Sequence, residues 1–255
     1  FAQMAEIKKK QDALVKKQER LLKKRLMTMK NDQLALKNEI KGQENKKEVL
    51  SIGVTMTIGE YAIVERLAAF LLKHPEMNLH IHYGNTAQLL TLLDKGDINM
   101  ALVEGNYPKE NYEHIKYSTE DYIAVCAVEH KFEQENPKTM KELLQERLLV
   151  REAGSGTRNI LEELLLARGM KIEDFQHYVK VENMHTIIGF LKKDCGISFM
   201  YKVAVEDELE KGTLREIQLL DFKMQHDFDF IWEKGSIYAE KYRAVCEELQ
   251  SYIRW

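Results

Sequence analysis

Residues 49–103 read VLSIGVTMTIGEYAIVERLAAFLLKHPEMNLHIHYGNTAQLLTLLDKGDINMALV, and their hydrophobic pattern switches between two periods. Short apolar runs at 49–54, 78–83 and 98–103 are typical of buried strands. Between these runs, residues 59–73 and 86–95 carry apolar side chains at the spacing of an amphipathic helix. A strand–helix–strand–helix–strand order with short loops predicts a parallel α/β sheet with helices on both faces.

The same alternation continues towards the C-terminus. It predicts strands at 122–128, 148–150, 178–181, 196–200 and 227–233, and helices at 156–168, 184–193, 202–211 and 237–253. Right-handed crossovers place the carboxyl ends of parallel strands at one edge of a sheet. We therefore expect the loops that follow the strands to gather there and to form any ligand site.

Residues 1–47 differ from the rest of the chain in charge and in period. They hold 14 Lys and Arg against 6 Asp and Glu, whereas the remaining residues hold 24 against 35. Residues 1–41 contain neither Gly nor Pro, and they predict a long basic helix that ends at Gly42 and the polar residues 43–47.

A narrow apolar stripe runs along this helix at three-, four- and seven-residue steps: Met4, Ile7, Leu14, Leu21, Leu22, Leu26, Met29, Leu36 and Ile40. We expect the stripe to pack on a partner helix, most simply its own copy in a dimer. The basic face could meet nucleic acid or simply be solvated.

Composition excludes several classes of protein. The 255 residues are 44% hydrophobic and 31% charged, no run of about 18 apolar residues occurs, and the chain does not open with a secretory pattern. Cys126, Cys195 and Cys246 are odd in number and lie far apart, which indicates neither a zinc site nor a disulfide framework. We expect a cytoplasmic protein with no membrane contact, metal or cofactor, and with its cysteines buried as small hydrophobic side chains.

Five motifs in one order resemble the effector-binding domain of LysR-type transcriptional regulators. They are LSIGVTMTIGEY (50–61), HPEMNLHIHYGNT (74–86), GDINMALVEG (96–105), REAGSGTR (151–158) and CGISFM (195–200), and the resemblance covers about 49–255. It implies two Rossmann-like lobes joined by two crossing strands near Tyr122 and Asp227, as in periplasmic solute-binding proteins. It also implies a small-molecule inducer between the lobes and a homodimer or homotetramer.

The resemblance also implies how the chain is divided. Residues 1–47 correspond to a linker and dimerisation helix, residues 48–122 with 229–255 to lobe I, and residues 123–228 to lobe II. Members of the family begin with a winged helix-turn-helix domain that binds DNA. Nothing in residues 1–48 has the turn between two short helices that such a domain needs. We therefore expect the parent protein to bind DNA through a domain absent from this chain.

The first candidate effector site is formed by Thr55, Met56 and Thr57, which follow the first strand and precede a helix. Hydroxyl groups and free backbone amides at a helix N-terminus suit a carboxylate, sulfate or phosphate. In the family, the matching positions line the effector cleft. The alternative is an ordinary helix N-cap formed by Thr57.

The second candidate lies in the other lobe, from Arg151 to Thr157. Ser155, Gly156 and Thr157 open a helix, and Gly156 lets the backbone approach a ligand closely. The residues could form an anion cradle or a plain cap. Arg151 could pair with the ligand, with Glu152 or with another carboxylate.

Weaker candidates complete the predicted set. Gly84, Asn85 and Thr86 either contact the ligand or form a strand-to-helix turn in which Asn85 tolerates a left-handed backbone. Glu104 ends the third strand. His185 either binds an anion or is solvated in its loop.

These observations favour the effector-sensing and oligomerisation part of a transcription regulator that binds a small, anionic metabolite. The alternative is a solute-binding protein of a transport system, which has the same fold. An enzyme is a third option, but the sequence shows no paired carboxylates, metal-ligand cluster or nucleophile–base pair that would support catalysis.

Overall fold

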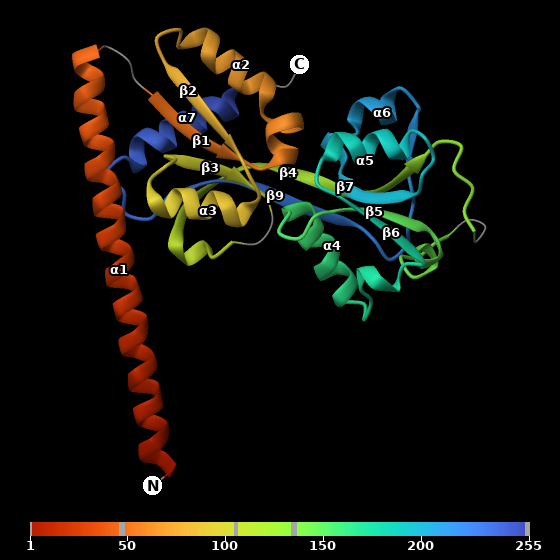
Figure 1. Ribbon diagram of the computed structural model, residues 1–255, viewed down its shortest axis with the longest axis horizontal. Helices are drawn as coiled ribbons and strands as arrows, with labels where there is room; N and C mark the ends of the chain where they lie inside the picture. Colours follow the sequence, from red (N-terminus) through yellow and green to blue (C-terminus); the bar gives the residue numbers. More distant parts are fainter. Residues whose placement is uncertain (1, 46–48, 105–106, 134–136, 253–255) are drawn as a thin grey trace.

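The computed structural model describes residues 2–45, 49–104, 107–133 and 137–252 (Figure 1). The strands are β1 (Val49–Val54), β2 (Asn78–Tyr83), β3 (Met100–Val103), β4 (Tyr112–Ala127), β5 (Arg147–Arg151), β6 (His177–Val181), β7 (Ile197–Tyr201), β8 (Leu214–Glu216) and β9 (Met224–Glu233). The α-helices are α1 (Ala2–Asn45), α2 (Val64–Lys73), α3 (Thr86–Lys95), α4 (Gly156–Leu166), α5 (Met184–Leu191), α6 (Glu206–Glu210) and α7 (Ala239–Ser251).

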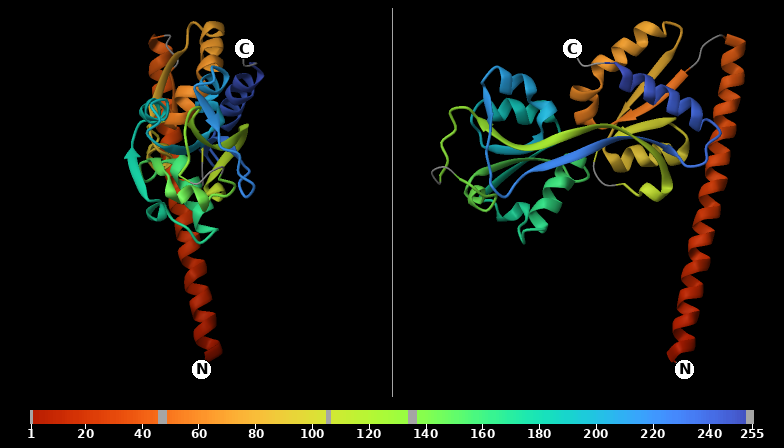
Figure 2. Two further views of the ribbon diagram at one scale, coloured as in Figure 1. Left: turned by 90° about the vertical axis from the view of Figure 1, so that its right-hand side faces the viewer. Right: turned by 180° about the vertical axis from the view of Figure 1, so that it is seen from behind.

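The sheet is continuous across two lobes, in the order β2-β1-β3-β9-β4-β7-β5-β6, with β8 paired to β4. Within lobe I, β1 is parallel to β2 and β3; within lobe II, β5 is parallel to β6 and β7. The two long strands β4 and β9 are antiparallel to each other and pass from one lobe to the other (Figure 2). The predicted parallel pairing is therefore confirmed within each lobe and wrong for the crossing strands, which pair antiparallel with their neighbours.

Helices cover both faces of the sheet because side chains along a strand alternate in direction. Ile52 and Val54 of β1 pack into the large core that also holds residues of α2, α7 and α4. Gly53 faces the other way, where a Cβ atom would lie 2.6 Å from Ile98 Cδ1 and 2.8 Å from Leu89 Cδ2. A side chain at position 53 would therefore require the ends of Leu89 in α3 and of Ile98 to shift.

Five elements of the two lobes differ from the sequence prediction, as does the end of α1, and the other predicted bounds agree within two residues. Strand β4 begins ten residues before the expected position 122, and its partner β9 begins three residues before 227. The three-residue strand β8 was not predicted. The expected helix 59–73 is a π-helical turn, Ile58–Ala62, followed by α2, and the expected helix 202–211 is a 3-10 turn, Lys202–Ala204, followed by α6. Of the cysteines, Cys126 and Cys246 are buried as expected, while Cys195 is partly exposed.

Helix α1 contacts lobe I through polar side chains. It extends past the predicted end at Gly42 to Asn45, and residues 46–47 lie outside the described residues. Asp32 accepts hydrogen bonds from Ser236 Oγ (2.7 Å) and from the backbone amide of Ile237 (3.1 Å). The Lys24 ammonium lies 4.0 Å from the centre of the Tyr112 ring. The predicted apolar stripe is exposed wherever its side chains are described: Ile7, Leu14, Leu21, Leu22, Leu26, Met29 and Leu36. Its packing on a partner helix stays a prediction.

Asn31 is the side chain of α1 that ties it to the end of α3. Its Nδ2 donates to the backbone oxygen of Asp94 (3.2 Å) and to Glu233 Oε2 (3.1 Å), and it lies 3.4 Å from the backbone oxygen of Leu93. It thus satisfies the Asp94 carbonyl, a group in the last turn of α3, where carbonyls have no partner within the helix. We expect Asn31→Ala to lower the free energy of unfolding by about 1–3 kcal/mol, because the buried Glu233 carboxylate also loses one of its hydrogen-bond donors. Urea denaturation measures this, with the exposed neighbour Gln33→Ala as a control; equal midpoints for the two variants would contradict it.

No helix among the described residues is long and apolar enough to cross a bilayer.

Candidate functional site

Three of the predicted site residues meet between the lobes around one carboxylate. Thr55 follows β1, Glu104 follows β3, and Thr157 lies in the first turn of α4 in lobe II. Glu104 Oε2 accepts a hydrogen bond from Thr55 Oγ1 (3.2 Å), and Glu104 Oε1 accepts one from Thr157 Oγ1 (3.0 Å). Thr57 Oγ1 lies 3.3 Å from Thr157 Oγ1. We call Thr55, Thr57, Glu104 and Thr157 the interlobe cluster; each of its members is at most 2% exposed.

Neither of the two helices that begin at the interlobe cluster has an N-cap side chain bonded to its first turn. Thr57 has helical backbone angles, and its side chain caps nothing, so the N-cap alternative for Thr57 is wrong. Ser155 precedes α4 with an extended backbone but also makes no side-chain cap bond. The Glu104 carboxylate lies at the start of α4 from the other lobe and accepts a hydrogen bond from Thr157 Oγ1 there (3.0 Å). An anion at this position is favoured by the partial positive charge of the α4 N-terminus.

Gly156 is needed for this contact between the lobes. A Cβ atom there would lie 2.5 Å from Glu104 Cγ and 2.9 Å from the Glu104 backbone oxygen. Gly156→Ala should force the lobes apart and lower the free energy of unfolding by about 1–3 kcal/mol, the usual range for overpacking. Thermal and urea denaturation test this. Gly189→Ala is the matched control, since that glycine also lies in a helix but has open space around it. A Gly156→Ala variant as stable as Gly189→Ala would refute the steric argument.

Burial dominates the electrostatics of the interlobe cluster. Removal from water disfavours the charged form and raises the pKa of Glu104 to about 7, although the hydrogen bonds from Thr157 and Thr55 and the charge of Arg151 oppose the rise. Arg151 is 4% exposed and forms a bidentate pair with Glu152, from Nε to Oε2 (2.8 Å) and from Nη2 to Oε1 (3.0 Å). Arg151 therefore pairs with Glu152, which was one of the three partners that the sequence analysis offered for it.

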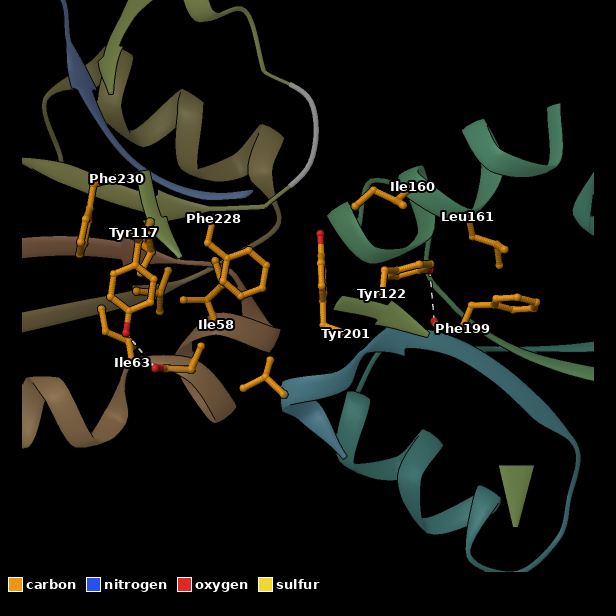
Figure 3. Packing of buried hydrophobic residues seen from close by; sticks show 14 of the residues in the cluster. Ile58, Ile63, Tyr117, Tyr122, Ile160, Leu161, Phe199, Tyr201, Phe228 and Phe230 are labelled. Carbon is orange, nitrogen blue, oxygen red and sulfur yellow. Dashed lines mark hydrogen bonds between the residues drawn. The ribbon is translucent and has the colours of Figure 1, made fainter. Parts of the chain in front are cut away.

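Two tyrosines beside the interlobe cluster were not predicted from the sequence. The Tyr122 hydroxyl donates to the backbone oxygen of Thr157 (2.8 Å) and lies 3.2 Å from that of Phe199. Tyr201 packs edge-to-face on Tyr122 at 5.3 Å and on Phe228 at 4.7 Å, and its ring stands between the lobes (Figure 3). The buried Tyr201 hydroxyl has no hydrogen-bond partner within the described parts of the chain. Burial raises the pKa of both hydroxyls well above the usual value, so both are donors at neutral pH.

The remaining candidates lie at different distances from this centre. Thr86 Oγ1 donates to the backbone oxygen of Glu104 (2.9 Å), so Thr86 adjoins the cluster. Asn85 caps α3 by a reciprocal bond pair with Gln88, so the strand-to-helix turn is present, but the Asn85 backbone is extended rather than left-handed. A Cβ on Gly154 of lobe II would lie 3.2 Å from Asn85 Nδ2, which places Asn85 at the lobe boundary.

Three further predicted residues add no side-chain hydrogen bond to the cluster. Gly84 continues the turn after β2, and its amide donates to Val54 O. Met56 is partly buried beside Thr55. His185 is exposed in the first turn of α5, and no hydrogen bond joins it to the interlobe cluster in the part of the chain that the structure describes. The described residues also contain no group of three His, Cys, Asp or Glu side chains able to hold a metal ion.

Comparison with known proteins gives one consistent family. The model of the LysR substrate binding domain matches residues 43–254. A probable RuBisCO transcriptional regulator of Trieres chinensis is 24% identical over 180 residues, which are 69% of this chain and 58% of that protein. The HTH-type transcriptional regulator YeiE of Escherichia coli K12 is 27% identical over 169 residues, 66% of this chain and 56% of YeiE. The chain therefore spans a little over half the length of these two relatives.

Solved regulatory domains share the fold. The regulatory domain of Synechocystis PCC6803 CcmR in complex with 2-PG superposes with a TM-score of 0.70 at 16% identity, covering 80% of this chain and 96% of that one. The effector-binding domain of QuiR in complex with shikimate gives a TM-score of 0.66 at 15% identity, covering 81% and 97% of the two chains. The reduced form of OxyR also gives 0.66, at 19% identity and with 81% and 96% covered.

Proposed function

Because the chain belongs to the LysR substrate-binding domain family, as an effector-binding domain of a transcription regulator, we propose that its effector is a small oxyanion that binds at the interlobe cluster. One observation carries this proposal: hydroxyl groups from both lobes already hold a carboxylate there, that of Glu104. The donors of the cluster therefore match an oxyanion in chemistry and in spacing. A ligand that binds the closed arrangement of the lobes more tightly than the open one shifts the equilibrium towards the closed arrangement.

The parts of the chain have separate roles in this proposal. Residues 48–122 with 229–255 form lobe I, and residues 123–228 form lobe II. Helix α1 serves as the linker helix of the segment 1–47, and its exposed apolar side chains support contact with a second copy in a homodimer or homotetramer. The parent protein binds DNA through a domain outside this chain and acts in the cytoplasm. The curated relatives are named transcriptional regulators, which favours regulation over the transport alternative.

A ligand screen followed by matched variants tests the site. Small anions, including 2-PG and shikimate, are screened by thermal shift; a ligand at about 100 times its dissociation constant adds about 2.7 kcal/mol of stability. For any ligand found, calorimetry should show that Thr55→Val and Thr157→Val each weaken binding about tenfold, because each removes a hydroxyl that donates to the carboxylate at this position.

The control is Thr91→Val, which removes a hydroxyl from the exposed face of α3, away from the cluster. All three variants should remain folded. Unchanged affinity in both cluster variants would show that the ligand binds elsewhere.

A further inference from the structure

Glu104 places its carboxyl group between the lobes, where hydroxyl groups of both lobes donate to it. One carboxylate oxygen accepts from Thr55 of lobe I and the other from Thr157 of lobe II, so this single side chain links the lobes. It also lies at the N-terminus of α4, an 11-residue helix whose own N-cap residue, Ser155, makes no cap bond. A helix N-terminus with free amides is a binding site for carboxylate and phosphate groups.

A second anion does not fit beside this carboxylate. Glu104 is 2% exposed, and the Gly156 backbone lies against its Cγ atom, so the space next to it is filled. The nearest cation named above, Arg151, has its Nε and Nη2 atoms engaged by Glu152. Above about pH 7, where the Glu104 carboxyl group is ionised, two like charges in this poorly solvated site repel strongly. An incoming oxyanion must therefore take the place of the Glu104 carboxylate rather than join it.

We propose that the Glu104 carboxylate is a built-in ligand, which holds the two lobes together when no effector is bound and which an oxyanion effector displaces. The proposal rests on the proposed function only for the statement that the effector binds at the interlobe cluster. It names the effector's recognition group: a carboxylate, sulfate or phosphate that accepts hydrogen bonds from Thr55, from Thr157 and from the α4 N-terminus. The effector then exchanges one anion for another, and the released Glu104 side chain must move out of the cluster.

Removing the built-in ligand should create a site for a free one. Glu104→Ala deletes the atoms of one acetate ion, so acetate is the probe. We expect sodium acetate to raise the melting temperature of Glu104→Ala saturably, with an affinity at least about tenfold higher than for the wild-type chain. Sodium chloride at the same ionic strength should not do so. Glu104→Ala combined with Thr157→Val should lose the effect, and Glu173→Ala, which removes an exposed carboxylate of lobe II, should behave like wild type.

Two results would overturn the proposal. One is a Glu104→Ala variant that acetate stabilises no more than it stabilises the wild type. The other, if that variant does not fold, is a Glu104→Gln variant whose affinity for inorganic sulfate equals that of the wild type at about pH 8, because a neutral amide of the same size should yield the site more readily than a carboxylate does. Acetate binding that depends on Thr157 supports the built-in ligand whatever the effector screen shows. A screen without any ligand for the wild-type chain bears on the proposed function alone.

Discussion

Phe228→Ala is expected to lower the free energy of unfolding by about 3–5 kcal/mol, the usual cost of deleting a buried phenylalanine ring. Phe228 is fully buried in the crossing strand β9 and packs edge-to-face on Tyr201 of lobe II at 4.7 Å (Figure 3). It belongs to the core that continues from one lobe into the other. Its loss therefore removes contacts that hold the lobes as one cooperative unit.

Urea denaturation followed by two probes measures this effect. Leu220→Ala is the control, because Leu220 is 85% exposed and its truncation should change stability by less than about 0.5 kcal/mol. Non-coincident transitions in Phe228→Ala would show that the lobes now unfold separately. A decrease in the free energy of unfolding of less than about 1 kcal/mol would show that the packing of the crossing strands does not depend on the Phe228 ring.

Stability should fall as the pH rises from about 4.5 to about 7, and Glu104→Gln should remove most of that fall. The folded chain keeps the Glu104 proton up to a pKa of about 7, whereas the unfolded chain releases it near the ordinary glutamate pKa of 4.5. Unfolding therefore releases a proton in this window, and higher pH favours the unfolded state. At about 1.4 kcal/mol for each pH unit, the contribution of Glu104 is on the order of 3 kcal/mol.

The comparison of the two proteins isolates Glu104 from other titrating groups. Burial also raises the pKa of Glu233, which adds a slope of the same sign to both proteins. Hydrogen bonds from Lys73 and His74 lower the pKa of Glu248 to about 2, so the stability due to Glu248 is lost only below the window. Urea midpoints at several pH values give both profiles. If the two proteins gave parallel profiles of stability against pH, Glu104 would not hold its proton with a raised pKa in the folded chain.

Most of the fold could be predicted because it follows from local patterns. The strands and helices of residues 49–103 were expected nearly at their observed bounds, since apolar periodicity reports which face of an element is buried. The first ten residues of β4, YEHIKYSTED, were missed because they are mostly polar and only half-buried. They form a strand through pairing with β9, which is more than one hundred residues away in the chain.

The candidate site was predicted in part. The strand ends at Thr55, Thr57 and Thr157 were selected from their place before helices, and the structure brings them together. Glu104 ranked among the weaker candidates although it lies at the centre. Tyr122 and Tyr201 were not selected at all, because a tyrosine in a strand is most often part of the core. An aromatic residue at the point where the chain crosses between lobes was the available signal.

Chain order and periodicity were enough to predict alternating strands and helices, a long basic helix and the edges at which a ligand would bind, because each depends on residues close together in the chain. The division into two lobes came from the family resemblance. Which side chains meet at those edges depended on how β4 and β9 set one lobe against the other. Glu104 reaches Thr157 across 53 residues of sequence, and the cost of burying its charge depends on that distant hydroxyl and on the start of α4. No local pattern encodes such a contact, because the contact exists only when both lobes are folded and packed together.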